Sequence, residues 1–274
     1  MRLLVVTMAA LAAIAILVRL VEARFAFFPS AGEQQTPDDL GLTFELATLT
    51  TSDGERLRAW VLLSPTPKAL VVYFHGNGGN LSVWLPILAE LHRQGFTVGA
   101  FDYRGYGAST GRPSEEGLYR DVDAALEWTA RLVTPGRPVV YWGRSLGTTM
   151  AAYAAAKRKP SGLVLEAGFA DVRSLLRASP LLAVLSLFSS YRFPTAEYAG
   201  RAGCPVLVMH GDTDGVIPFA NGRELYASLP EPKRFQTIAG GDHNDVVPPD
   251  PHTYWTAVHQ YVATLPSATN DAPR

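Results

Sequence analysis

The 274-residue chain has one cysteine, almost no net charge and no internal repeat. The single cysteine, Cys204, excludes an internal disulfide and a zinc site built from cysteines. Its place before Pro205, at the start of an apolar run, is typical of a buried thiol. A formal net charge of −1 provides no basic surface that would favour nucleic acid. With 47% hydrophobic residues, the chain can form one substantial core.

Two loops that could hold a cofactor or a metal have the wrong spacing for either. The three glycines of segment 105–111 loosely imitate a dinucleotide-binding loop, but they lie too far from the preceding strand, and Pro113 interrupts the start of the helix. Asp212 and Asp214 lack the third acidic ligand and the closing glutamate of an EF-hand. We therefore expect no cofactor and no metal.

An apolar segment opens the chain. Residues 3–18 are apolar apart from Thr7, and as a helix they span about 24 Å. Continuing the helix through Arg19 nearly covers a bilayer core of about 30 Å, because an arginine side chain can reach back to the interface. Residues 1–24 are therefore predicted to be an uncleaved membrane anchor that takes no part in catalysis. The alternative is a signal peptide cleaved after Ala23.

The orientation of this segment depends on charges that nearly balance. Arg2 and the amino terminus oppose Arg19 and Arg24 across the apolar run. We expect a single-pass anchor with the domain on the periplasmic or extracytoplasmic side. If the segment is cleaved, the protein is secreted.

The rest of the chain alternates strand and helix signals. After a connector at 25–39, with Phe27-Phe28-Pro29 at the membrane interface, two alternating segments predict a hairpin. From Ala69, continuous apolar runs predict strands buried on both faces. The expected strands are 44–50, 56–63, 69–74, 96–101, 139–142, 163–166, 206–210 and 234–238; the main helices are 81–94, 114–133, 219–228 and 251–265. This order predicts a mostly parallel, eight-stranded α/β sheet flanked by helices over 25–266, before a flexible tail at 267–274.

The segment Gly143-Arg144-Ser145-Leu146-Gly147 reads G-x-S-x-G between an apolar strand and a run of small residues. That context is typical of a nucleophile elbow, where a serine hydroxyl is exposed at the tip of a sharp strand-to-helix turn. The flanking glycines let the helix pass close to the strand. The N–H of Leu146 is then expected to face a developing oxyanion. An ordinary Gly-Ser turn is the alternative for the pentapeptide alone.

Other loops follow strands at the sheet edge where α/β proteins place their sites. The glycine-rich loop 75–80 is predicted to supply a second oxyanion donor, the N–H of Asn77, while His75 holds the loop. In the next loop, Asp102 and Arg104 are expected to form one structural ion-pair cluster with Arg144.

Two later loops complete a candidate triad. Loop 210–218 offers Asp214, and loop 240–245 offers His243. Ser145, Asp214 and His243 follow the chain order of the α/β-hydrolase arrangement. The histidine would take the proton of the serine, the aspartate would orient the histidine, and an acyl-enzyme would form and be hydrolysed.

These motifs resemble the α/β-hydrolase superfamily and, within it, the membrane-anchored Bem46-like hydrolases. The resemblance covers about 25–265 in register. The matching segments are His75-Gly-Asn-Gly-Gly-Asn80, Asp102-Tyr-Arg-Gly-Tyr-Gly107, Gly143-Arg-Ser-Leu-Gly147, His210-Gly-Asp-Thr-Asp214 and Asp242-His-Asn-Asp245. The resemblance implies a triad of Ser145, Asp214 and His243, an N-terminal anchor, and ester, thioester or occasionally peptide substrates. Asp242 departs from the family pattern, which has a small residue there, and puts a second carboxylate near the histidine.

Residues 168–203 interrupt the strand–helix pattern, and 180–188 are almost entirely apolar. This insertion is predicted to be a lid whose Leu182, Leu185 and Phe188 contact the substrate; a buried core helix is the alternative. We predict hydrolysis of medium-chain acyl esters or thioesters. The alternatives are a serine peptidase on the same triad and a non-catalytic binding protein. The sequence leaves the acyl chain, the leaving group and the oligomeric state open.

Overall fold

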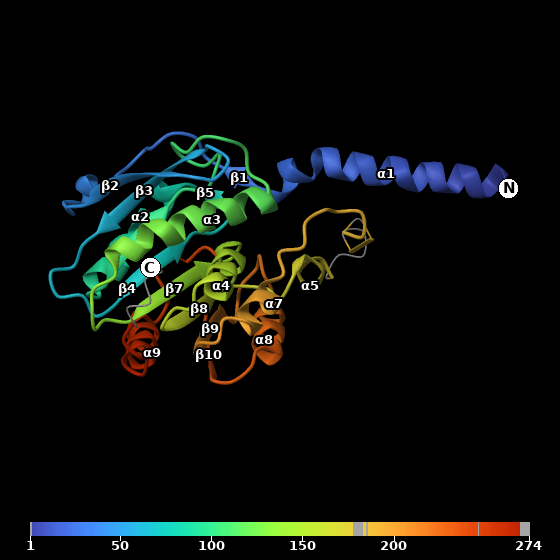
Figure 1. Ribbon diagram of the computed structural model, residues 1–274. Coiled ribbons are helices and arrows are strands. Elements are labelled where there is room, and N and C mark those ends of the chain that lie inside the picture. Colours follow the sequence, from blue (N-terminus) through green and yellow to red (C-terminus); the bar gives the residue numbers. More distant parts are fainter. Residues whose placement is uncertain (1, 178–182, 185, 246, 269–274) are drawn as a thin grey trace.

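The computed structural model describes residues 2–177, 183–184, 186–245 and 247–268, and eight of its strands form one twisted sheet (Figure 1). The strand order is β10-β9-β8-β7-β4-β6-β3-β2. The six strands from β10 to β6 are parallel, and β3 and β2 run antiparallel at the edge. The predicted mostly parallel, eight-stranded sheet is therefore confirmed.

The element bounds agree with the sequence prediction to within a few residues. The sheet strands are β2 Glu45–Thr50, β3 Arg56–Leu62, β4 Leu70–Phe74, β6 Thr97–Phe101, β7 Val139–Arg144, β8 Gly162–Glu166, β9 Val206–Gly211 and β10 Lys233–Ile238. A second, two-stranded sheet consists of β1 Phe28–Pro29 and β5 Gly78–Gly79. The α-helices are α1 Arg2–Ala26, α2 Leu81–Arg93, α3 Glu115–Thr129, α4 Gly147–Lys157, α5 Val172–Leu176, α7 Thr195–Gly200, α8 Phe219–Ser228 and α9 Pro251–Ala263. Short 3₁₀ helices occur at Pro37–Leu40 and Ala130–Leu132.

Helices cover both faces of the sheet and bury two cores (Figure 1). Along β4, Val72 and Phe74 belong to the core under α3 and α4, whereas Val71 and Tyr73 belong to the core under α2 and α9. Side chains of a strand point alternately to opposite faces, so a strand covered on both faces must be apolar throughout. This explains the continuous apolar run from Ala69.

The segment that follows α1 is a docked part of the domain rather than a loose connector. Phe27 is buried and packs edge-on against the rings of Tyr191 and Phe193. β1 pairs in parallel with β5, which lies in the glycine-rich loop after β4. The placement of Phe27 at a membrane interface was therefore wrong, since this aromatic side chain finds apolar partners within the domain. Phe28, by contrast, is 58% exposed.

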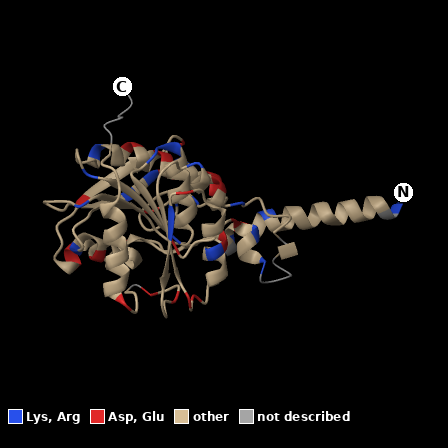
Figure 2. Ribbon diagram, turned by 90° about the horizontal axis from the view of Figure 1, so that it is seen from below, with Lys and Arg blue, Asp and Glu red and all other residues tan. Residues whose placement is uncertain are grey.

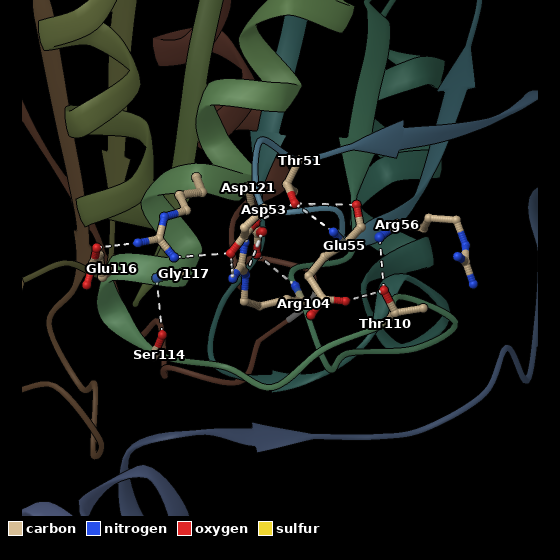
Figure 3. A network of polar contacts seen from close by, with 11 residues as sticks. Thr51, Asp53, Glu55, Arg56, Arg104, Thr110, Ser114, Glu116, Gly117 and Asp121 are labelled. Atoms are coloured by element: carbon tan, nitrogen blue, oxygen red, sulfur yellow. Dashed lines mark hydrogen bonds and ion pairs between the residues drawn. The ribbon is translucent and has the colours of Figure 1, made fainter.

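The expected cluster of Asp102, Arg104 and Arg144 does not form, because each group has its own partners. Arg104 pairs with Asp53 of the β2–β3 turn and Asp121 of α3, as Figure 3 shows. The carboxylate of Asp102 instead accepts from the N–H of Leu81, at the start of α2. The network around Arg104 ties the hairpin to α3 and lies apart from the contacts of Arg144, which concern the candidate site below.

Candidate active site

Ser145 lies at the tip of a sharp turn between β7 and α4. Its φ is 55°, in the left-handed region that residues other than glycine rarely adopt, and its N–H donates to the carbonyl of Glu166 on β8. A Cβ on Gly143 would overlap the backbone of Gly147, and a Cβ on Gly147 would overlap the backbone of Phe74 at the end of β4. The G-x-S-x-G spacing is therefore a steric requirement of this turn, and it holds the serine above the end of the sheet.

The structure brings Ser145, Asp214 and His243 together from three separate loops. His243 Nε2 lies 3.1 Å from Ser145 Oγ, and His243 Nδ1 lies 2.8 Å from Asp214 Oδ2. The histidine is thus placed between the hydroxyl and the carboxylate with good hydrogen-bond geometry to both. Asp212, the other acidic residue of its loop, is exposed and accepts from the N–H of Gly240.

The environment of Asp214 favours its charged form. Burial alone would raise the pKa of this carboxyl, but hydrogen bonds from His210 and His243 outweigh burial and hold it well below its usual range. The backbone N–H groups of Val216 and Ile217 also donate to Oδ1. An ionised Asp214 can keep the Nδ1 proton on His243, which leaves Nε2 free to accept one.

Arg144 fixes the loop that carries His243. Its Nη2 donates to the carbonyl oxygens of His243 and Asp245 at 2.9 and 2.7 Å. Its Nη1 lies 3.7 Å from Glu166, and both side chains are buried. Burial opposes the charge, but the neighbouring carboxylate and other groups raise the pKa of Arg144, so the guanidinium stays charged. The residue before the serine therefore links the elbow to the histidine loop.

Two backbone N–H groups beside the serine are free to act as donors. Among the described residues, neither Leu146 N–H nor Asn77 N–H has a hydrogen-bond partner. Leu146 directly follows the serine at the start of α4, and Asn77 lies in the loop after β4. The Asn77 side chain is fixed by Ala26 O and by the hydroxyl of Tyr106. The loop is therefore held, while its N–H remains available.

His75 is fully buried behind this loop. Its Nδ1 lies 2.7 Å from Gly76 O, which only accepts, so the ring proton is on Nδ1 and the Nε2 lone pair faces Asp102 at 3.6 Å. Burial lowers the pKa of His75 to about 4 and raises that of Asp102 to about 7. These values make His75 neutral at pH 7, and its position supports the expected role in holding the loop.

Asp242 does not contact the ring of His243 as its sequence position suggested. Its carboxylate accepts from the N–H groups of Gly215 and Asn244. It therefore joins the loop of Asp214 to the loop of His243 by backbone contacts. Among the described residues, no group of three or more His, Cys, Asp or Glu side chains could hold a metal ion.

An apolar cavity of about 1500 Å³ lies in front of Ser145 and His243. Its described walls include Gly76, Asn77 and Leu146, and residues of α5 and of the 186–193 segment. Of the three lid residues chosen from the sequence, Leu182 and Leu185 lie outside the described residues. Phe188 is half-buried and is not among the described residues that line the cavity.

Two groups of cavity residues were not predicted from the sequence. Val172, Leu175 and Leu176 of α5 line it, and their helical spacing was a signal for one apolar face. Val18, Val21 and Glu22 of α1 also line it, which the reading of 1–24 as a segment outside the site did not anticipate. An apolar helix gives no sequence signal of which face, if any, meets the domain.

Comparison with known proteins gives matches at the level of family and fold. The family model for the alpha/beta hydrolase fold matches residues 69–183. The membrane protein YNL320W of Saccharomyces cerevisiae is 32% identical over 238 residues, which are 83% of this chain and 82% of that protein. The lysophosphatidylserine lipase ABHD12 of Danio rerio is 32% identical over 180 residues, 57% of this chain and 46% of that protein. The Pyrococcus furiosus esterase Pf2001 has the same fold, with a TM-score of 0.70 and 17% identity over 88% of this chain and 98% of that one.

Proposed function

Because the chain belongs to the α/β-hydrolase family and is related to its Bem46-like members, we propose that it is a serine hydrolase cleaving carboxylic esters or thioesters. The observation that carries the proposal is the chain of contacts from Ser145 Oγ through His243 to Asp214, at the base of an apolar cavity. A hydroxyl, a base and an orienting carboxylate in this order are what acyl transfer to serine requires.

In the proposed mechanism, Ser145 Oγ attacks the carbonyl carbon of the substrate while His243 Nε2 takes the hydroxyl proton. Asp214 stabilises the imidazolium that forms. The N–H groups of Leu146 and Asn77 donate to the oxyanion, a contact that strengthens as negative charge develops. His243 returns the proton to the leaving alcohol or thiol. A water molecule, deprotonated by the same histidine, then hydrolyses the acyl-enzyme.

The cavity supports an acyl substrate of medium length. Its described walls carry mostly aliphatic and aromatic side chains. Burial of an acyl chain against them would contribute about 0.8 kcal/mol of binding free energy per methylene. One relative named above is a lysophosphatidylserine lipase, and this chain shares its fold with an esterase, which agrees with an ester substrate. We therefore place esters and thioesters ahead of peptides.

We also propose that α1 is an uncleaved anchor. Its segment Leu4–Arg24 has the length and composition to cross a membrane, and the yeast relative is named a membrane protein. Cleavage after Ala23 would remove Glu22, whose carboxylate accepts hydrogen bonds from Ser189 and Ser190 of the domain. Extracytoplasmic placement remains a prediction, testable by protease access to the domain in sealed membrane vesicles.

The test is labelling of the purified full chain with a fluorophosphonate, together with a panel of p-nitrophenyl esters, acyl-CoA thioesters and aminoacyl-anilides. We expect labelling and ester hydrolysis by the wild type and loss of both in Ser145→Ala. Ser267→Ala, on an exposed serine far from the elbow, is the matched control. Labelling that persists in Ser145→Ala would end the assignment, and faster cleavage of the anilides than of every ester would favour a peptidase.

A further inference from the structure

The end of α1 is part of the cavity in front of the serine. Val18, Val21, Glu22 and Ala26 all line it. Their spacing of three or four residues places them on one side of the helix. Side chains on this side are half-buried, whereas Leu20 on the other side is 74% exposed. One face of the last three turns of α1 is therefore directed at the candidate active site.

Specific contacts hold this face in place. The Glu22 carboxylate accepts from Ser189 Oγ and from the N–H and Oγ of Ser190. Four residues further on, the carbonyl of Ala26 accepts from the side chain of Asn77, the residue that offers the oxyanion N–H. The helix is thus hydrogen-bonded to both the lid segment and the glycine-rich loop, on two sides of the cavity.

If α1 spans the membrane as proposed above, its length puts the cavity at the bilayer. The span Leu4–Arg24 has 21 residues and is about 31 Å long, close to a hydrocarbon core of about 30 Å. Up to Ile14, every described side chain of α1 is exposed, and the next residue is half-buried. From Leu4 to Ile14 the helix is about 16 Å long. The remaining thickness has to be crossed by the part of the helix that carries Val18 and Val21. The cavity wall therefore lies at the depth of the lipid.

The surroundings of the cavity fit contact with lipid. Phe28, Val83 and Val216 line it and are each more than half exposed. Leu187, in the segment beside Ser189, is 65% exposed. Figure 2 shows α1 without charged residues between its N-terminal tip and the turns next to the domain, where Arg19 is the first charge after Arg2. Exposed apolar side chains gathered around one opening mark a surface that meets an apolar partner.

We propose that the last three turns of α1 form one wall of the acyl-binding site, and that the acyl chain of a membrane-resident ester enters this site directly from the bilayer. The proposal rests on the proposed function and makes the anchor a determinant of specificity. A tryptophan at a lining position of α1 would fill the space for the distal acyl chain and leave the serine and the oxyanion donors untouched.

The test compares Val21→Trp with Leu20→Trp in the full chain, reconstituted in phosphatidylcholine vesicles. The neighbouring leucine receives the same change on the side of α1 that faces away. We expect the ratio of kcat/KM for p-nitrophenyl octanoate to that for the acetate to fall about tenfold in Val21→Trp, as if one or two methylenes lost their contacts. The ratio should stay within about twofold of wild type in Leu20→Trp. Val18→Trp and Leu17→Trp form a second pair one turn away.

The outcomes separate this inference from the proposed function. If the wild type hydrolyses esters through Ser145 but both members of a pair have the same ratio, α1 is not a wall of the site. An equal loss on acetate and octanoate would also overturn the inference, because it would mean general damage. If the wild type neither hydrolyses the esters nor reacts with a fluorophosphonate, the proposed function itself fails.

Entry from the bilayer has a separate readout. Leu187→Cys, labelled with an environment-sensitive fluorophore, should shift to shorter emission wavelengths in the vesicles. Leu46→Cys on β2 is the control, because β2 lies at the end of the domain away from α1 (Figure 1) and Leu46 is also exposed. The native Cys204 is buried. The same emission at both positions would overturn entry from the bilayer.

Discussion

The floor and the cover of the cavity are built in different ways. The floor is the elbow and the ends of β4, β7, β8 and β9, whose side chains are buried throughout. The cover is the end of α1 and the described residues of 168–193, and its contact with α1 runs through hydrogen bonds from Ser189 and Ser190 to the half-buried Glu22. Close packing fixes atoms to fractions of an ångström, whereas a few half-exposed hydrogen bonds permit movement.

This difference separates two tasks. The proposed chemistry needs a serine, a base and two donors in fixed positions, and the floor provides them through strands whose ends are set by the sheet. In the proposal above, selection of the acyl chain depends on the wall that α1 supplies to the cavity. We therefore expect changes in the floor to reduce the turnover of all esters, and changes in the cover to alter which esters are preferred.

The largest expected effect is at the carboxylate of the floor. Asp214→Asn should lower kcat by about 10⁴-fold, because the amide can no longer hold the imidazole in the required tautomer or stabilise its charge. Asp212→Asn should cost less than about threefold, since Asp212 only accepts from the N–H of Gly240 on the exposed side of the loop. Steady-state rates with p-nitrophenyl acetate measure both. Equal losses, or the reverse order, would give the acid role to another residue.

The next effect concerns Arg144, which holds the histidine loop by donating to two of its carbonyl groups. Arg144→Met should lower kcat on acetate and octanoate alike by about 100-fold, because the carbonyls of His243 and Asp245 lose their donor and the imidazole loses its alignment. Arg144→Lys keeps the charge near Glu166 and should recover part of the loss. An unchanged kcat with a raised KM would show that Arg144 does not act through the histidine.

The sequence predicted the floor well and the cover poorly. The elbow, the glycine-rich loop and the two late loops each carry their signal within a few consecutive residues, because close approach of backbone segments demands glycine at fixed spacing. The contact of Glu22 with Ser189 joins residues 167 positions apart through side chains found on any protein surface. Nothing in either local sequence indicates the other, so this contact could come only from the fold.

The sequence did not predict that Asp102 and Arg104 have different partners, for a related reason. The two residues are oppositely charged and two positions apart, which suggested a shared cluster. In the structure the Asp102 carboxylate accepts from Leu81 N–H, and the Arg104 guanidinium pairs with Asp53 and Asp121. Which partner each side chain meets depends on elements brought in from both sides of the loop. Charge type and spacing alone do not determine such pairings.

Behind the floor, the burial of His75 and Asp102 should affect the pH dependence of stability, because burial shifts the pKa of each group. The folded pKa of Asp102 is raised to about 7, so its contribution is present at acid pH and is lost as the pH rises through 7. The folded pKa of His75 is lowered to about 4, so its contribution is lost as the pH falls below about 6.5. Between pH 7 and 5 the two contributions have opposite signs and nearly cancel.

Asp102→Asn should remove this compensation. Relative to wild type, the free energy of unfolding of the variant should fall by about 2 kcal/mol between pH 7 and pH 5, because only the unfavourable protonation of His75 remains. Denaturant unfolding in the detergent-solubilised full chain, at both pH values, measures the difference. Asp38→Asn, on an exposed aspartate, is the control. The same pH dependence in Asp102→Asn and wild type would show that this carboxyl titrates as an ordinary surface group.

The smallest expected effect tests the cover. Glu22→Gln keeps the size of the side chain but replaces a charged acceptor of three hydrogen bonds with a neutral one, which weakens each bond. The end of α1 should then separate from Ser189 and Ser190 more often. We expect KM for p-nitrophenyl octanoate to change by about threefold, a free-energy difference of roughly 0.6 kcal/mol, while kcat for the acetate stays at the wild-type value. Glu127→Gln, on an exposed face of α3, is the matched control and should change neither quantity. A fall in acetate kcat in Glu22→Gln would mean that the cover also holds the oxyanion loop in place, through Ala26 and Asn77, and that floor and cover are not independent.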